Sequence, residues 1–194
     1  MDTFIYTSTP SRVIFGQGKV ATLPEEISRL GVSRCLVLCT KQQTAEAKKL
    51  KDLLGDKAVG FYDNATMHTP IHITEEAIES AATLKADSVV SIGGGSTIGL
   101  GKAISIRTGV PHICIPTTYA GSEMTPILGE TVDGRKTTRI DPKIKPDVVI
   151  YDVDLTMTLP VGLSLTSSIN AIAHAGKFLF KTIVDNGCAV ADKT

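Results

Sequence analysis

The feature that most constrains this chain is the segment 88–103, which reads SVVSIGGGSTIGLGKA. A β-branched apolar run leads directly into three consecutive glycines, and a helix-like stretch follows. In open α/β sheets, ligands bind beyond the carboxyl ends of strands, where the next helix presents unpaired N–H groups and its positive dipole end. Glycine lets the backbone approach a pyrophosphate, and hydroxyls donate to its oxygens. The residues predicted to contact phosphate are Gly93, Gly94, Gly95, Ser96 and Thr97.

Two standard phosphate-binding motifs are absent from this segment. A GxGxxG fingerprint that began at Gly93 would require glycine at position 98, which is Ile98. A P-loop ending at Lys102 would require glycine at position 96, which is Ser96. The alternative to a phosphate site is a turn whose glycines only permit tight packing between strand and helix.

A second polar loop, residues 115–126 with the sequence IPTTYAGSEMTP, follows the next apolar run. Taken alone it would be an ordinary polar connection, but beside the triple glycine it predicts a crevice at one edge of the sheet. The candidate binding residues of this loop are Thr117, Thr118, Gly121 and Ser122.

Short β-branched runs alternate with helix-like stretches along most of the chain. The runs are RCLVLC, KAVGFY, DSVVSI, PHICIP and DVVIYD, and the stretches include QQTAEAKKLKDLL and ITEEAIESAATLKA. Strands that are apolar throughout are typical of parallel sheets covered on both faces, so we predict an α/β doubly wound, mostly parallel, Rossmann-like sheet. Thr74 is expected to be a helix N-cap, and residues 9–18 are expected to form a β-ribbon at a sheet edge.

Composition argues against several classes of function. Twenty basic residues balance twenty acidic ones, so no overall field favours nucleic acid or a membrane surface. The sequence contains no membrane-length apolar run and no secretory signal, so we expect a cytoplasmic protein. The four cysteines lack zinc-type spacing, and Cys35, Cys39 and Cys114 lie in strand-like runs, where core thiols are expected.

Four motifs resemble, in order and spacing, the N-terminal half of the iron-containing alcohol dehydrogenase superfamily, and most closely its maleylacetate reductase branch. They are SIGGGSTIGLGKAIS, PTTYAGSEMTP, KTTRIDPKIKPDVVIYDVDLTMTLP and SINAIAHA. The resemblance implies a nicotinamide-dependent oxidoreductase of aromatic-compound breakdown, which reduces maleylacetate to 3-oxoadipate. A metal-dependent alcohol dehydrogenase and a non-catalytic NAD-binding protein are the alternatives.

The resemblance also assigns roles to single residues. It puts the pyrophosphate loop on the triple-glycine turn, a second cofactor loop on residues 117–122, and a cofactor-contacting lysine on Lys136, ten residues before Pro146. Many family members carry an aspartate at the position of Thr40, where a carboxylate accepts from the ribose and repels a 2′-phosphate. Because Thr40 removes that repulsion, either NADH or NADPH is expected to serve.

Metal-dependent members use an aspartate and a histidine one helical turn apart, at positions that correspond to Asn170 and His174. A neutral amide is a poor ligand for a hard cation, so no metal is expected, and both residues are predicted to line the substrate cleft. The alternative for His174 is a histidine bonded within helix packing. His68 and His72 have helical spacing, but Pro70 lies between them and argues against a metal pair.

The resemblance ends after Ala175, where the family continues into a helical second domain. We therefore expect residues 1–160 to form the dinucleotide-binding domain, residues 161–175 to begin the helical domain and residues 176–194 to be a non-matching tail. Gly176-Lys177-Phe178 can be encoded with a GTAAGT splice donor, which is consistent with a retained intron. Activity is expected to be impaired by the missing domain, and the N-terminal ribbon would suit a homodimer.

Overall fold

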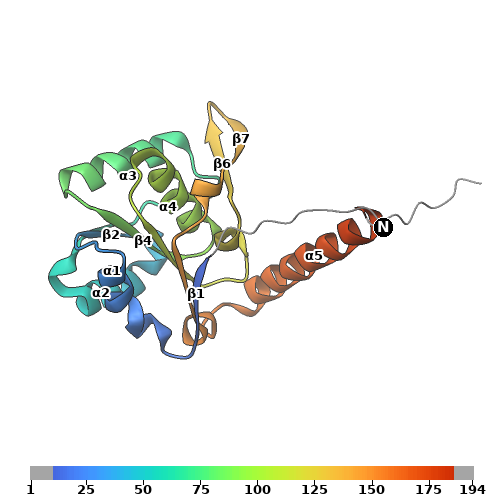
Figure 1. Ribbon diagram of the computed structural model, residues 1–194, viewed down its shortest axis with the longest axis horizontal. Coiled ribbons are helices and arrows are strands. Elements are labelled where there is room, and N and C mark those ends of the chain that lie inside the picture. Colours follow the sequence, from blue (N-terminus) through green and yellow to red (C-terminus); the bar gives the residue numbers. More distant parts are fainter. Residues whose placement is uncertain (1–10, 186–194) are drawn as a thin grey trace, which may run out of the picture.

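The computed structural model describes residues 11–185, with side chains described as far as residue 173. Its centre is a six-stranded parallel sheet in the order β1-β8-β5-β4-β2-β3, with helices on both faces (Figure 1). The predicted doubly wound class is confirmed. The strands are β1 (Arg12–Gly16), β2 (Cys35–Leu38), β3 (Ala58–Tyr62), β4 (Ser88–Gly93), β5 (His112–Pro116) and β8 (Val148–Asp152).

Two layers of helices cover the sheet. α1 (Leu23–Arg29) and α2 (Thr44–Leu54) pack on one face, whereas α3 (Ile71–Thr83) and α4 (Gly95–Thr108) pack on the other. Strand β2 shows why the pattern is apolar throughout: Cys35 and Val37 face the first core, whereas Leu36 and Leu38 face the second. All four side chains have no exposed surface, which is the expected state of a strand in the middle of a doubly covered parallel sheet.

The strand order reverses direction at β2. The chain passes from β2 outward to β3 and then crosses back over β2 to β4, so β2 and β4 are adjacent in space but connected through β3. In such sheets a crevice opens between the loops that leave the two strands at this switch point. Thr40 follows β2, and the triple glycine ends β4, so the fold itself brings these two segments together.

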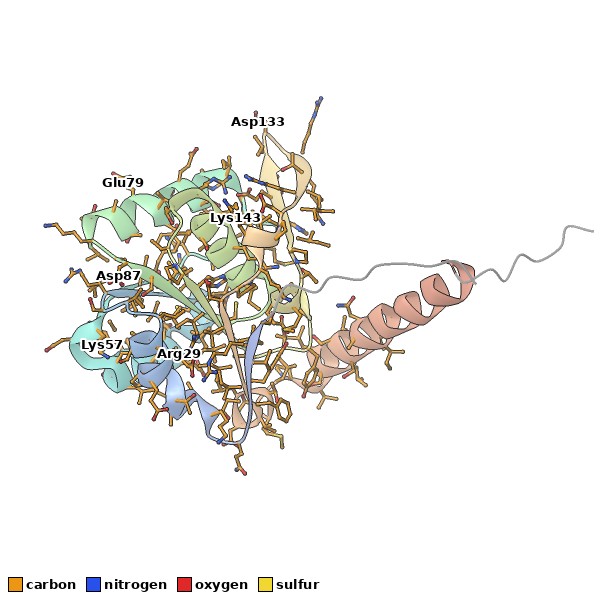
Figure 2. All side chains as sticks on the ribbon, viewed as in Figure 1. Arg29, Lys57, Glu79, Asp87, Asp133 and Lys143 are labelled. Carbon is orange, nitrogen blue, oxygen red and sulfur yellow. The ribbon has the colours of Figure 1, made fainter. Side chains whose placement is uncertain are left out.

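An antiparallel ribbon that the sequence did not predict stands beside α4. It consists of β6 (Ile127–Val132) and β7 (Arg135–Ile140), with Asp133 at its tip, as Figures 1 and 2 show. Of the expected N-terminal ribbon, Arg12–Gly16 forms a strand parallel to β8 at the edge of the described sheet, and residues 9 and 10 lie outside the described residues, so the ribbon pairing stays a prediction. The predicted cap is wrong: Pro70 occupies the N-cap position of α3, and Thr74 is buried inside the helix.

The last helix, α5 (Val161–Asp185), projects away from the α/β body (Figure 1). Its apolar side chains are exposed within the described part, for example Val161 at 77%, Ile169 at 65% and Ile172 at 71%. The helix continues through the position at which the family resemblance ends. Cys35, Cys39 and Cys114 are buried thiols, as expected, whereas Cys188 lies outside the described residues.

Candidate functional site

Three loops meet at the carboxyl ends of β2, β4 and β5. Gln43 joins the first to the third, because its Nε2 donates to Thr117 Oγ1 at 3.0 Å and its Oε1 accepts from Thr40 Oγ1 at 3.2 Å. The backbone N–H of Thr117 donates to the Gly93 carbonyl at 3.0 Å. These bonds fix the three loops relative to one another, so the predicted crevice belongs to the folded structure.

The glycines of the turn have different local surroundings. Gly93 has φ +147°, and a Cβ there would lie 2.5 Å from Gln43 Oε1, so no side chain fits. A Cβ at Gly94 would lie 3.1 Å from Thr118 Cγ2. Gly95, the first residue of α4, has no atom within 4 Å of a Cβ position. The bare backbone at Gly95 therefore faces open space at a helix N-terminus, where N–H groups have no intrahelical partner.

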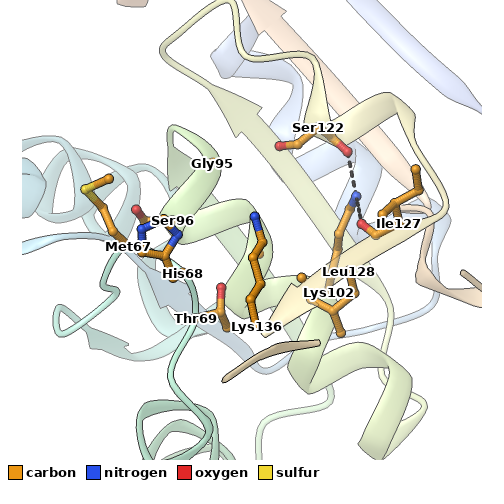
Figure 3. Close-up of a pocket in the computed structure, with 12 residues that line it drawn as sticks. Met67, His68, Thr69, Gly95, Ser96, Lys102, Ser122, Ile127, Leu128 and Lys136 are labelled. Atoms are coloured by element: carbon orange, nitrogen blue, oxygen red, sulfur yellow. Dashed lines mark hydrogen bonds between the residues drawn. The ribbon is translucent and has the colours of Figure 1, made fainter. Parts of the chain in front are cut away.

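A cavity of about 380 Å³ lies in front of this N-terminus (Figure 3). The loop before α3, the first turns of α4 and the β6–β7 ribbon all contribute to its walls. Lys136 extends from β7 into the space between Ser96 and Ser122. The lining residues are Met67, His68, Thr69, Gly95, Ser96, Gly99, Lys102, Ser122, Ile127, Leu128, Gly129 and Lys136. Two lysines, a histidine and a helix N-terminus make this cavity suitable for an anion.

A second cavity, of about 510 Å³, continues the first toward the ends of β2 and β3. The two share Met67 and Ser96, so they adjoin at the N-terminus of α4, and we call the pair of cavities the groove. The lining residues of the second cavity are Thr40, Lys41, Gln42, Asp63, Asn64, Ala65, Thr66, Met67, Ile73 and Ser96. A groove that passes a bare helix N-terminus at its middle suits an elongated ligand with a central pyrophosphate.

Lys102 is a site residue that sequence reasoning missed. It is 1% exposed, and its ammonium lies within hydrogen-bonding distance of the carbonyls of Ser122 (2.5 Å), Thr125 (2.8 Å) and Ile127 (2.9 Å) (Figure 3). Burial lowers the pKa of Lys102 to about 8, with the nearby Cys114 and Glu123 acting in the opposite direction. The lysine ties the second polar loop to α4. In the sequence, the signal for its burial was its position among the small and apolar residues of α4.

The structure distributes the predicted binding residues over three places. Gly95, Ser96, Ser122 and Lys136 line the first cavity, and Thr40 lines the second. Gly93 and Gly94 shape the turn between them, whereas Thr97 and Thr117 are buried. Thr97 Oγ1 and Ser122 Oγ are shielded from solvent without a hydrogen-bond partner. The residues that fall elsewhere are Thr118 and Gly121, which line a separate cavity of about 420 Å³ beside Phe15 and Tyr151.

Asn170 lies beside the second polar loop, where its Nδ2 donates to the Ala120 carbonyl at 3.4 Å. An amide nitrogen directed at a carbonyl presents no anionic oxygen, so this position does not fit a metal-ligating carboxylate. The side chain of His174 lies outside the described residues.

Among the residues that the structure describes, no three His, Cys, Asp or Glu side chains gather into a metal-binding group. His68 precedes α3 and has φ 65°, so it does not form a helical pair with His72.

Comparison with known proteins decides the family. The profile of the iron-containing alcohol dehydrogenases matches residues 10–153. The chain belongs to this family. A maleylacetate reductase from Rhizobium sp. (strain MTP-10005) is 54% identical over 180 residues, which are 93% of this chain and 51% of that protein. Maleylacetate reductase 1 from Rhodococcus opacus is 49% identical over 177 residues, 91% of this chain and 50% of the relative.

Solved structures of this iron-containing alcohol dehydrogenase family share the observed fold. The crystal structure of maleylacetate reductase from Agrobacterium tumefaciens superposes with a TM-score of 0.88 at 54% identity, over 90% of this chain and 50% of that one. This chain thus spans about half the length of the relatives that it matches. Within residues 11–185, none of the helices is both long and apolar enough to cross a membrane.

Proposed function

We propose that this chain is the dinucleotide-binding part of a maleylacetate-reductase-type enzyme, and that its groove holds NAD(P)H. The observation that carries the proposal is the open backbone at Gly95, in a groove whose first cavity is lined by Lys102 and Lys136. The identity of about half of all positions to maleylacetate reductases supports the substrate class.

The groove residues fit the parts of such a cofactor. The N–H groups of Gly95 and Ser96 would receive the pyrophosphate, and the Lys136 ammonium would balance its charge. The unpaired Ser122 Oγ would supply a further donor. Thr40, at the far end, would contact the adenosine ribose. When bound, the nicotinamide supplies a hydride from its C4 atom for the carbon–carbon double bond of the 2-ene-4-oxo diacid.

The substrate end of the reaction is proposed to involve Asn170 and His174, at the start of α5. In the relatives, the other half of the polypeptide would close on this side, orient the substrate and exclude water. A metal-dependent alcohol dehydrogenase is the weaker candidate, because Asn170 offers an amide where that chemistry requires a carboxylate.

Substitution of Gly95 tests the cofactor site. Because its Cβ position is open, Gly95→Ala should leave the helix as stable as before or more stable. The methyl group would nevertheless stand where the pyrophosphate approaches, and NADH binding should weaken by at least about tenfold. Calorimetric titration measures the affinity, and urea unfolding measures the stability. Unchanged affinity would refute the site. Gly94→Val is less informative, because its side chain would also press on Thr118.

Turnover tests the proposed reaction. NADH oxidation with maleylacetate is measured for this chain and for a hybrid in which the C-terminal half of the Rhizobium relative follows it. We expect the hybrid to turn over far faster, because orientation and water exclusion need both halves. Equal rates would show that this chain contains the whole active site. Cofactor binding without turnover in either protein would favour a non-catalytic NAD-binding role.

A further inference from the structure

The far end of the groove contains a carboxylate that comes from a strand other than β2. Thr40 follows β2, and Asp63 follows β3, and both line the cavity of about 510 Å³. Two backbone hydrogen bonds join the segments that carry them: Cys39 N–H donates to the Tyr62 carbonyl at 3.0 Å, and Ala65 N–H donates to the Cys39 carbonyl at 3.2 Å. Thr40 and Asp63 therefore emerge side by side from two paired parallel strands.

Asp63 and Lys41 are the charged side chains that line this cavity. Lys41 is exposed, so water screens its charge, whereas Asp63 is half-buried. The Asp63 charge also reaches the end of β2, because it adds to burial in raising the pKa of Cys39 to about 11. Among residues 11–173, Asp63 has no hydrogen-bond or ion-pair partner, so its oxygens are available to a ligand.

We propose that Asp63 is the residue that makes this groove select NADH over NADPH. This inference rests on the proposed function, since it needs a dinucleotide in the groove. A carboxylate accepts hydrogen bonds from ribose hydroxyls and repels a 2′-phosphate. The repulsion that Thr40 cannot supply is thus restored from the end of the neighbouring strand. Either nucleotide was expected from Thr40 alone, and the structure adds the group that distinguishes them.

Nucleotide affinities test the role of Asp63. NADH and NADPH are titrated separately against the full 194-residue chain, and the ratio of their dissociation constants is compared among variants. We expect the unchanged chain to bind NADH about tenfold more tightly than NADPH, a size typical of one unscreened charge contact. Asp63→Asn should bring the ratio to within about twofold of one, mainly by tightening NADPH binding.

Two further variants distinguish local charge from other effects. Asp52→Asn makes the same change of net charge on the exposed side of α2 and should leave the ratio unchanged. Asp63→Glu keeps the charge and should keep the preference for NADH. Equal or tighter binding of NADPH to the unchanged chain, or an unchanged ratio in Asp63→Asn, would overturn this inference alone. Binding of neither nucleotide would overturn the proposed function as well.

Discussion

The imidazole Nε2 of His112 lies 2.6 Å from Ser91 Oγ in the interior, where β4 and β5 meet α4. His112 is 1% exposed and Ser91 has no exposed surface. Burial, together with the positive charge of Lys102, lowers the pKa of His112 to about 3. The histidine is thus neutral in the folded protein at neutral pH.

Acid should destabilise the fold through this histidine. In the unfolded chain this histidine takes up a proton near pH 6.5, but in the folded chain it does so only near pH 3. The stability that neutral His112 contributes is therefore complete above pH 6.5 and is lost as the pH falls toward 3. The slope is at most about 1.4 kcal/mol per pH unit for one proton. Urea unfolding at several pH values should show a shallower slope for His112→Gln. Exposed His72→Gln is the control, and an unchanged slope in His112→Gln would contradict the prediction.

Gly101→Ala should destabilise the protein, although alanine usually favours a helix. A Cβ at Gly101 would overlap the His112 ring, which is 1% exposed in the interior. We expect a loss of about 1–3 kcal/mol, as for other overpacked cores. Gly162→Ala is the matched control, because its Cβ would meet no atom within 4 Å on α5. Chemical denaturation of both variants checks the difference, and equal stabilities would show that α4 can shift.

Lys102→Met should cost about 3 kcal/mol of folding free energy, because the three carbonyls of Ser122, Thr125 and Ile127 lose their shared donor. Methionine is unbranched and only one atom shorter than lysine, so most of the packing of the side-chain stem should be retained. NADH affinity should fall as well, since Ser122 and Ile127 lose their tie to α4. Lys49→Met, on the exposed side of α2, should change stability by less than about 0.5 kcal/mol. A Lys102→Met protein as stable as the parent would show that the ammonium is dispensable.

Removal of metal should not affect cofactor binding. The motivation is Asn170, whose amide faces the Ala120 carbonyl and which the family resemblance aligns with the metal-ligating carboxylate of other members. After dialysis against a chelator, the NADH dissociation constant should stay within about twofold of its value before dialysis, since the groove residues need no cation. Elemental analysis should find iron and zinc well below one equivalent. A tightly held equivalent whose removal abolishes binding would show that other residues complete a metal site.

Much of the fold could be predicted because it depends on local patterns. Apolar β-branched runs identified five of the six sheet strands, and Leu36 and Val37 show why: consecutive residues on a doubly covered strand are both buried. The triple glycine placed the centre of the groove. The β6–β7 ribbon was missed because Arg135–Ile140 is exposed along its whole length and shows no apolar alternation.

The sequence by itself determined the parallel α/β sheet, the glycine turn at the end of β4 and the amide at Asn170, because each follows from residue type and local spacing. Only the tertiary structure decided which distant groups share the groove. The burial of Lys102, the ring of His112 against Gly101 and the approach of Asp63 to Thr40 all depend on strand order. Sequence spacing cannot reveal them, because β2 and β3 bring residues 40 and 63 together only after α2 has packed and the strands have paired.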